Sequence, residues 1–382
     1  MSATAEDRTH MARALELAER SLYTTDPNPR VGCVIVREGV VLGEGWHERA
    51  GEAHAEVAAL AAAGGVRGAT AYVTLEPCSH TGRTGPCADV LIAADIRRVV
   101  CASVDPNPRV AGRGIRRLEA AGIEVEVGIL EEEARALNPG FFSRFERERP
   151  FVRLKLAMSL DGRTAPAAGG RRWISGPASR RDVQHLRARS SAVLTGVGTV
   201  RCDDPQLNVR LEYGPWVRQP LRVVLDAALA APLGARLFAG PGALVFAAGD
   251  APAAAAAALA ARGAEVLRVT AAARRLDLQA VMAKLAEREV NELLVECGPR
   301  LAGSFLEAGL VDELIVYMAP VLLGADASPL TALAGSSAEL LEALEITDVK
   351  LIEADIRLTL KPRRPAAAER VPRHSAAMAL DS

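Results

Sequence analysis

The sequence predicts an α/β protein with two domains. Short runs rich in β-branched residues alternate with stretches of helical periodicity along most of the chain, and this alternation is typical of sheets covered by helices. The length of 382 residues exceeds one ordinary domain, and each half is long enough to bury its own core. A charged segment with Pro and Gly, residues 137–150, precedes a fresh strand pattern and predicts a hinge between the domains.

The first half predicts a sheet whose strands are separated by helices. Runs rich in Val, Ile, Tyr and Thr predict strands, at 31–36, 40–46, 70–75, 98–104 and 123–128. Apolar residues at helical spacing predict helices, at 7–22, 54–63, 87–94 and 112–121. The hexapeptide DPNPRV occurs at 26–31 and again at 105–110, and both copies predict turns stiffened by proline.

The second half repeats the alternation with different residues. The predicted strands are 151–160, 192–196, 221–226, 243–248, 264–269, 292–298 and 313–319, followed by a pair near 347–361. We therefore expect a first domain over 1–148 and a second domain over 149–362. Residues 363–382 lack apolar periodicity, and we expect a disordered tail there.

Composition narrows the functional classes. A formal net charge of −1 gives no overall basic bias for nucleic-acid binding, and no apolar run approaches the length of a membrane span. The N-terminus is polar and then amphipathic, unlike a secretory signal, so we expect a cytoplasmic protein whose thiols stay reduced. Six cysteines in so long a chain do not make a disulfide framework, which favours Cys78 and Cys87 as metal ligands.

Four residues of the first half form a candidate zinc site with an acid–base partner. His54 stands at the start of a predicted helix, Cys78 follows a strand, and Cys87 begins another helix. One imidazole and two thiolates give three zinc ligands, and a fourth position left to water is the catalytic arrangement. Glu56 can take a proton from that water and return it to a departing amine. The alternative is a non-catalytic binding protein with a structural zinc ion.

The motifs NPRVGCVIV, HAE and TLEPCSHTGRTGPC resemble the cytidine deaminase-like superfamily. They resemble more closely the deaminase half of the bifunctional deaminase/reductase family of riboflavin biosynthesis. The resemblance implies one Zn²⁺ per chain on the three ligands, with Glu56 as the catalytic residue. It also implies that substrate is bound by Asn28, His47, His80 and Arg83. Arg83 is a residue type suited to a phosphate group.

In the second half, SLDGRTA, WIS, TGVGTVRCDDPQLNVR and GPRLAGSFL resemble the reductase half of the same family. Without the resemblance, the residues predict only an α/β domain that binds a phosphorylated ligand. The resemblance implies a fold similar to dihydrofolate reductase and the cofactor NADPH. The positions implied for NADPH are Ala157, Trp173, Thr199, Asp203, Gly298, Pro299, Arg300, Leu301, Ala302, Gly303 and Ser304. Those implied for substrate are Arg171, Arg187, Leu207, Arg210 and Glu296.

Three positions depart from the family pattern. Arg171 is bulkier than the small polar residue expected there, Ala227 replaces a common serine, and Arg300 replaces Thr or Ser. The departures at Ala227 and Arg300 affect how tightly NADPH is expected to bind. Asp203 is the best candidate for proton transfer in the reduction, and the alternative is that it only orients the nicotinamide.

The resemblance extends from about residue 8 to about residue 361 and implies two reactions. Zinc-dependent hydrolysis deaminates 2,5-diamino-6-ribosylamino-4(3H)-pyrimidinone 5′-phosphate, and NADPH then reduces the ribosyl side chain to ribityl. We expect this phosphorylated pyrimidine as the partner, no nucleic acid, no membrane, and a homo-oligomeric state. The alternative is a nucleic-acid base deaminase with an accessory domain, which would need a basic groove with aromatic stacking residues.

Overall fold

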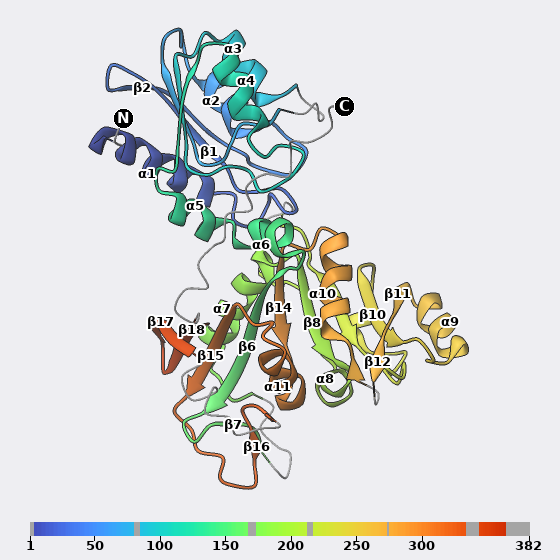
Figure 1. The fold of residues 1–382 in the computed structure, drawn as a ribbon. Helices are drawn as coiled ribbons and strands as arrows, with labels where there is room; N and C mark the ends of the chain where they lie inside the picture. Colours follow the sequence, from blue (N-terminus) through green and yellow to red (C-terminus); the bar gives the residue numbers. More distant parts are fainter. Residues whose placement is uncertain are drawn as a thin grey trace, which may run out of the picture.

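The computed structural model describes residues 4–79, 85–166, 173–211, 217–272, 275–333 and 344–363. These residues form two α/β units, each built on its own large sheet (Figure 1). All but the first residue of the expected tail, 363–382, lies outside the described part of the chain. Within that part, no helix combines the length and apolar character that a membrane crossing requires.

The first unit contains a five-stranded sheet in the order β2-β1-β3-β4-β5. Its strands are β1 (Gly32–Arg37), β2 (Val40–Trp46), β3 (Thr70–Val73), β4 (Arg98–Cys101) and β5 (Glu124–Val127). β1 pairs antiparallel with β2 and β3, whereas β3, β4 and β5 run parallel. Parallel neighbours need crossover connections, and helices supply them here.

Helices cover both faces of this sheet. They are α1 (Ala5–Glu19), α2 (Ala55–Ala62), α3 (Cys87–Ala93), α4 (Arg113–Ala120) and α5 (Glu131–Leu137). Met11 of α1 and Ala134 of α5 are buried in one cluster, which also contains alternate strand residues such as Val34. Ala59 of α2 and Leu91 of α3 belong to the cluster on the opposite face. Each central strand is therefore apolar on both sides, as its sequence run indicates.

α2 lies very close to β2 because β2 carries two glycines. A Cβ atom on Gly43 would lie 2.4 Å from the carbonyl oxygen of Ala59. A Cβ atom on Gly45 would lie 2.3 Å from the backbone nitrogen of Ala59. With no side chain at either position, the backbone of the helix can rest directly on the strand. This contact fixes the position of the first turn of α2, which follows His54.

The hinge predicted at 137–150 is wrong, because most of this segment is helical. α6 (Pro139–Arg147) begins with proline at its first position, where a missing backbone N–H leaves no bond unmade. Phe141 and Phe142 are buried against Leu75 of the first unit. The proline starts a helix instead of interrupting one, and α6 lies between the two units (Figure 1).

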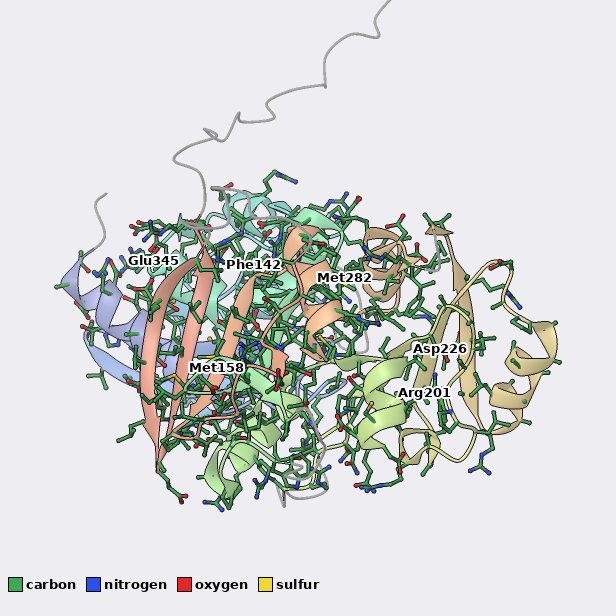
Figure 2. The ribbon with its side chains drawn as sticks, turned by 90° about the horizontal axis from the view of Figure 1, so that it is seen from below. Phe142, Met158, Arg201, Asp226, Met282 and Glu345 are labelled. Carbon is green, nitrogen blue, oxygen red and sulfur yellow. The ribbon has the colours of Figure 1, made fainter. Side chains whose placement is uncertain are left out.

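The second unit contains a nine-stranded sheet in the order β11-β10-β9-β8-β14-β6-β15-β18-β17. Its strands are β6 (Phe151–Ser159), β8 (Ala192–Gly196), β9 (Leu221–Leu225), β10 (Ala243–Ala248), β11 (Ala264–Val269), β14 (Glu292–Glu296), β15 (Glu313–Ala319), β17 (Leu344–Ile352) and β18 (Asp355–Pro362). The strands from β11 to β15 run parallel, and β18 and β17 close one side antiparallel. Glu345 on β17 and Asp226 after β9 lie toward opposite sides of the molecule (Figure 2).

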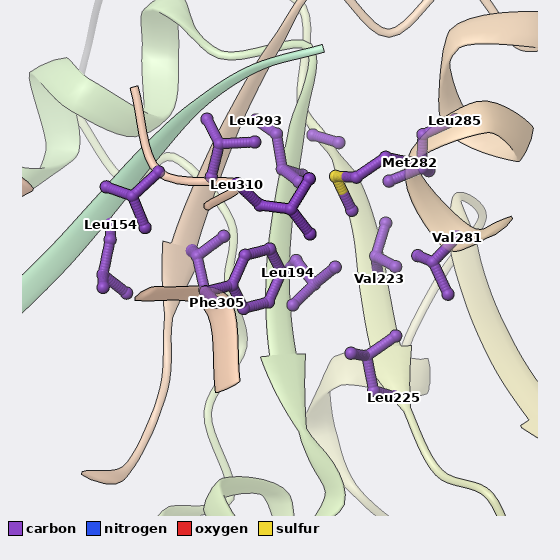
Figure 3. Packing of buried hydrophobic residues seen from close by; sticks show 14 of the residues in the cluster. Leu154, Leu194, Val223, Leu225, Val281, Met282, Leu285, Leu293, Phe305 and Leu310 are labelled. Atoms are coloured by element: carbon purple, nitrogen blue, oxygen red, sulfur yellow. The ribbon is translucent and has the colours of Figure 1, made fainter. Parts of the chain in front are cut away.

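Smaller elements complete this unit. Its helices are α7 (Pro177–Arg189), α8 (Val197–Asp203), the 3₁₀ turn η1 (Arg236–Phe238), α9 (Ala253–Ala261), α10 (Leu278–Glu287) and α11 (Pro299–Glu307). Two short ribbons pair β7 (Arg163–Ala165) with β16 (Ser328–Pro329) and β12 (Ala271–Ala272) with β13 (Arg275–Leu276). Met282 and Leu285 of α10 and Phe305 of α11 pack with Leu194 and Leu293 of the sheet (Figure 3).

The first copy of the hexapeptide joins the two units. The hydroxyl of Ser191 donates to Asp26 at 2.7 Å, and the side-chain amide of Asn291 donates to the carbonyl oxygen of Pro27 at 2.8 Å. Gly140 of α6 also approaches Asn291, which directly precedes β14. A Cβ atom on Gly140 would lie 2.5 Å from the backbone of Asn291. The two sheets are thus connected through specific polar contacts, with α6 packed against the start of β14.

Candidate functional site

Three predicted metal ligands meet in the first unit. Nδ1 of His54 lies 3.2 Å from Sγ of Cys87 and 3.6 Å from Sγ of Cys78. The three ligand atoms all lie within 4.8 Å of one another. A single zinc ion can reach all of them, because its bonds to sulfur and nitrogen are about 2.3 and about 2.0–2.1 Å long.

Two of the ligands stand at helix starts, and the third lies in the loop after a strand. His54 is the N-cap residue of α2, Cys87 is the first residue of α3, and Cys78 follows β3 in the chain. The unpaired amides at a helix N-terminus favour negative charge nearby, and a thiolate supplies it. The backbone N–H of Cys87 donates to Sγ of Cys78 at 3.3 Å, which is a contact of this kind.

The donor set fits a catalytic zinc ion. The Cys87 thiol, and after it His54 and the Cys87 backbone, lower the pKa of Cys78 by hydrogen bonding, and the thiolate is the form that binds metal. Among the described residues, no fourth His, Cys, Asp or Glu joins the three ligands. Three protein ligands leave one tetrahedral position for water or substrate, whereas structural zinc sites are closed by four.

Glu56 is buried beside the three ligands. It lies in the first turn of α2, two residues after His54, and is 3% exposed. Burial raises the pKa of Glu56 above its usual range. A raised pKa suits a carboxylate that must accept a proton and return it.

His47 and Asn28 form a polar pair in the same region. Nδ1 of His47 donates to the carbonyl oxygen of Ala53 at 3.0 Å, so Nε2 is left to accept from the Asn28 amide at 3.1 Å. Burial lowers the pKa of His47, which favours this neutral form. The His47 and His54 rings meet edge to face, with centroids 5.4 Å apart.

One cavity of about 720 Å³ contains these groups. Its volume lies within the range of pockets that hold small molecules. Asn28, His47, His54, Glu56 and Cys78 line one part of it. Both copies of DPNPRV contribute to the wall, and so do α6 and α10. The second unit therefore helps to enclose a cavity whose metal ligands all belong to the first.

Sequence reasoning missed Glu76, which holds the second hexapeptide in place. This carboxylate is 3% exposed and accepts the backbone N–H groups of Asp105 at 3.2 Å and of Gly112 and Gly114 at 2.9 Å. Those donors lie about 30 to 40 residues further along the chain. No local motif therefore predicts the hydrogen bonds to Glu76. Glu76 fixes the loop that faces the metal ligands.

Three predicted substrate residues lie outside the described part of the chain. They are His80 and Arg83 in the loop between Cys78 and Cys87, and Arg171 before α7. Their roles stay predictions.

Several of the predicted cofactor residues of the second unit lie at one edge of its sheet. Ala157 lies near the carboxyl end of β6, Thr199 is in α8 directly after β8, and Gly298 follows β14. The strands β6, β14 and β8 are parallel neighbours, so their carboxyl ends share an edge. Ligands of open parallel sheets bind in the crevice beyond these ends. Trp173 precedes α7, where the guanidinium of Arg180 lies 5.4 Å from its ring centroid.

The start of α11 fits the phosphate groups of a dinucleotide. Gly298 is the N-cap residue, no side chain caps the first turn, and residues 299–304 form the first turns of the helix. A Cβ atom on Gly298 or on Gly198 would meet no protein atom within 4 Å, so an anionic group can approach the backbone there. Exposed amides at a helix N-terminus bind phosphate. The chemistry of this edge therefore suits NADPH.

Arg187 and Glu296 form a buried ion pair at the same edge. Nε and Nη2 of Arg187 lie 2.6 and 3.0 Å from the two carboxylate oxygens of Glu296. Lys155 stands opposite Glu296 in the register of β6 and β14, and sequence reasoning missed it. Burial lowers the pKa of Lys155, while the charge of Glu296 opposes this change. A lysine followed by alternating apolar residues looks like an ordinary strand residue, and only strand order places it beside Glu296.

The other predicted substrate residues differ in what they can offer. The side chain of Leu207 is 1% exposed and packs among apolar residues, so only its backbone can reach a ligand. Arg210 is exposed, and its Nη1 donates to Asn208 Oδ1 at 3.2 Å. Asp203 is the last residue of α8.

Two family models match the chain. Residues 4–103 match the cytidine and deoxycytidylate deaminase zinc-binding region, and residues 150–358 match the RibD C-terminal domain. The riboflavin biosynthesis protein RibD of Escherichia coli K12 is 50% identical over 346 residues, which cover 86% of this chain and 92% of that protein. The Haemophilus influenzae protein of the same name is 44% identical, with 94% and 98% covered.

The chain belongs to the RibD family. Solved structures agree over nearly the full length. Acinetobacter baumannii RibD has a TM-score of 0.87 at 44% identity and covers 94% of this chain and 99% of its own. A Thermotoga maritima structure has a TM-score of 0.81 at 33% identity, with the same coverage. It is described as a diaminohydroxyphosphoribosylaminopyrimidine deaminase/5-amino-6-(5-phosphoribosylamino)uracil reductase.

Family membership confirms the expected fold class, a cytidine deaminase-like unit followed by a dihydrofolate reductase-like unit. It also confirms a bifunctional enzyme of riboflavin biosynthesis, with a zinc-binding deaminase domain and a reductase domain that uses NADPH. Neither the nucleic-acid base deaminase nor the non-catalytic zinc protein accounts for a second half that matches the RibD reductase domain.

Proposed function

We propose that this enzyme deaminates 2,5-diamino-6-ribosylamino-4(3H)-pyrimidinone 5′-phosphate and then reduces the ribosyl side chain of the product to ribityl with NADPH. The observation that carries the deaminase half is that His54, Cys78 and buried Glu56 share one cavity. The Thermotoga maritima relative, whose description gives both activities, supports the pairing of a deaminase with a reductase in one chain.

In the deamination, water replaces the 2-amino group of the ring and ammonia leaves. A zinc ion held by His54, Cys78 and Cys87 would act as a Lewis acid that makes this water nucleophilic near neutral pH. Glu56 accepts a proton from the water and delivers it to the departing amine. The Asn28 amide, held in place by the neutral His47, orients the pyrimidine through its remaining hydrogen-bonding groups, and His47 lines the same cavity beside the ring. The roles proposed for His80 and Arg83 are contacts to the ring and the phosphate.

In the reduction, the ribosylamine ring opens to a C=N group, which accepts hydride at the former ribose C1′. NADPH bound at residues 298–304 would supply this hydride. Arg187, held in place by Glu296, offers a fixed cation for a phosphorylated substrate. Lys155, beside Glu296, can donate a proton as the ring opens. It is a stronger candidate for the acid than Asp203, because Asp203 ends α8 whereas Lys155 faces the Arg187–Glu296 pair.

The remaining assignments complete this proposal. NADPH would also contact Ala157, Trp173, Thr199 and Asp203, and substrate would contact Arg171, the backbone of Leu207, and Arg210. We keep the division at 148/149, which falls between α6 and β6. A cytoplasmic location suits the site, because a disulfide between Cys78 and Cys87 would remove two metal ligands.

A homo-oligomer is also part of the proposal. β17 is the last strand in the sheet order, so no strand from the described part of the chain pairs with one side of its backbone. Ile346, Val349 and Leu351 on this strand are 56%, 60% and 72% exposed. An apolar edge strand is an exposed surface that a second chain can cover. Light scattering on a sizing column measures the oligomeric state directly. A monomer at all protein concentrations would contradict the proposed homo-oligomer.

The test of the proposed function is to give the purified protein the diaminopyrimidine nucleotide with and without NADPH. Mass analysis should find the deaminated nucleotide without NADPH and the ribityl product with it. The variant Glu56→Gln keeps the shape of the side chain and removes the base, so ammonia release should fall at least 100-fold. Its reduction of added deaminated nucleotide should stay normal, which shows that the chain is folded. Full ammonia release by Glu56→Gln would remove Glu56 from this role.

A further inference from the structure

Arg144 of α6 is a buried cation without a close counter-ion. Its side chain is 10% exposed, and its Nε has no hydrogen-bond partner among the described residues. The nearest carboxylate is that of Glu289, at 3.7 Å from Nη1, which is beyond hydrogen-bond distance. Burial lowers the pKa of Arg144, which agrees with a charge that the protein stabilises poorly.

Three other arginines, of which Arg30 and Arg187 are buried and Arg189 is partly exposed, are paired with a carboxylate much more closely. Arg30 and Arg189 both lie within 3.0 Å of Glu292, and Arg187 lies 2.6 Å from Glu296. A buried guanidinium with unmet donors is costly unless a partner supplies the missing contacts. The difference indicates that none of the described residues is a close partner of Arg144, and that a bound anion can supply the missing contacts.

Arg144 lines the cavity that contains the metal ligands. The cavity wall on this side also includes Phe145 of α6 and Ala286 of α10. The ring centroid of Phe145 lies 4.6 Å from the guanidinium carbon, so the ring holds the cation against the cavity wall. Glu289 is 67% exposed, and its weak contact can be replaced by a more strongly charged anion.

We propose that Arg144 binds the 5′-phosphate of the nucleotide during deamination, and so contributes to the preference of the deaminase for a nucleotide over a nucleoside. The proposal rests on the proposed function. A guanidinium presents paired N–H donors that match two phosphate oxygens. Of the described residues around the cavity, the cationic ones are Arg109 and Arg144. Arg109 is exposed to solvent, whereas Arg144 is buried and lacks a close partner.

The inference also gives the second unit a part in the first reaction. Glu289 follows α10, and Ala283 and Ala286 of α10 line the same cavity. The deaminase pocket is therefore completed across the junction of the units, with α6 between them.

The test compares the nucleotide with the corresponding 5′-hydroxyl nucleoside in the full-length enzyme loaded with zinc. KM for the nucleotide is measured from ammonia release, and nucleoside affinity is measured as inhibition of that reaction, so the nucleoside need not be turned over. Arg144→Gln should raise KM for the nucleotide about 10- to 100-fold, as expected for the loss of charged hydrogen bonds, and leave nucleoside affinity unchanged. Arg144→Lys should recover part of the loss.

Arg147→Gln is the matched control, because Arg147 lies on the same helix but pairs with Asp312 of the second unit. It should leave the ratio of nucleotide to nucleoside affinity as in the wild type. NADPH-dependent reduction of the deaminated nucleotide should stay normal in both variants, which shows that they fold. Equal weakening of nucleotide and nucleoside by Arg144→Gln, or no weakening, would overturn the proposal. A wild-type enzyme that releases no ammonia from the nucleotide would instead contradict the proposed function.

Discussion

Arg30 and Glu292 form a buried ion pair that joins the two units, with Nη1 and Oε1 2.8 Å apart. The residues are separated by 262 positions, and their side chains are 8% and 3% exposed. Glu292 also accepts from Arg153 and, at 3.0 Å, from Arg189. One buried carboxylate thus balances three guanidinium groups, and one of these comes from the first copy of DPNPRV.

Glu292→Gln should destabilise the folded protein strongly. The variant leaves buried Arg30 without its carboxylate partner, removes one of the two carboxylates of buried Arg153, and also unpairs the partly exposed Arg189. Breaking a buried pair from one side costs about 3–5 kcal/mol. Urea-induced unfolding at neutral pH measures the free energy of unfolding of the variant and of the wild type. Glu119→Gln, on the exposed surface of α4, is the control and should change the free energy of unfolding by less than about 0.5 kcal/mol.

The contribution of Glu292 to the stability of the folded protein should disappear in acid. Burial alone would raise its pKa, but Arg189, Arg153 and Arg30 together lower it below the usual value. A carboxylate with a lowered pKa in the folded state stabilises fully above the unfolded pKa of about 4.3, and this stabilisation is lost as the pH falls further. The difference between wild type and Glu292→Gln should therefore be constant from pH 8 to about pH 5 and shrink below about pH 4. A difference that grows in acid would contradict the ion-pair account.

Cys87→Ser should abolish zinc binding and deamination while leaving reduction intact. Removal of one of three protein ligands leaves too few donors for a stable catalytic site. Metal content by atomic emission and the two activities are measured on the same preparation. The matched control is Cys101→Ser, whose thiol is buried in β4 and is not one of the three converging ligands. It can cost stability but should retain zinc, and equal zinc content in wild type and Cys87→Ser would refute the site.

Gly45→Val should weaken zinc binding without touching a ligand. A side chain at this position would collide with the backbone of α2 and displace the turn that carries His54 and Glu56. Overpacking of this kind costs about 1–3 kcal/mol of stability. Titration with a zinc-binding dye measures the affinity. Gly65→Ala, where a Cβ would meet no atom within 4 Å, should behave like the wild type, and unchanged affinity in Gly45→Val would show that α2 is not held by this contact.

Lys155→Gln should lower kcat of the reduction about 10²- to 10⁴-fold if Lys155 donates the proton. The loss is measured as NADPH oxidation with the deaminated nucleotide, and ammonia release in the first reaction should stay normal. A purely structural lysine would lower stability but leave the pH profile unchanged. Because burial lowers the pKa of Lys155, wild-type kcat/KM for reduction should fall as the pH rises through a value below the ordinary 10.4. The variant should lack this decline.

The elements of the deaminase unit follow from local sequence to a large extent. The runs at 40–46 and 87–94 correspond closely to β2 and α3, because short-range periodicity and a proline at a helix start act within a few residues. The same locality explains the metal site. His54 and Cys87 each stand at a predicted helix start, so the sequence could indicate three ligands before any packing was known.

The segment 137–150 shows where local signals fail. Its proline and charges resemble a hinge, yet its aromatic residues bury against Leu75 and make it helical. Whether these aromatic side chains are buried depends on Leu75, a partner more than 60 positions away in the sequence. Propensity is a weak prior that tertiary contacts override.

The sequence by itself determined the α/β class and the existence of two units, and it predicted the metal ligands and Glu56, which the fold brings together. Tertiary structure alone decided that Arg30 lies in the junction while Arg109, at the same place in an identical hexapeptide, is exposed to solvent. It also decided that Lys155 stands beside Glu296 and that Arg144 lines the zinc cavity. The physical reason is that helix starts and strand runs depend on neighbours in the chain, whereas the surroundings of a charge depend on strand order and on which surfaces meet.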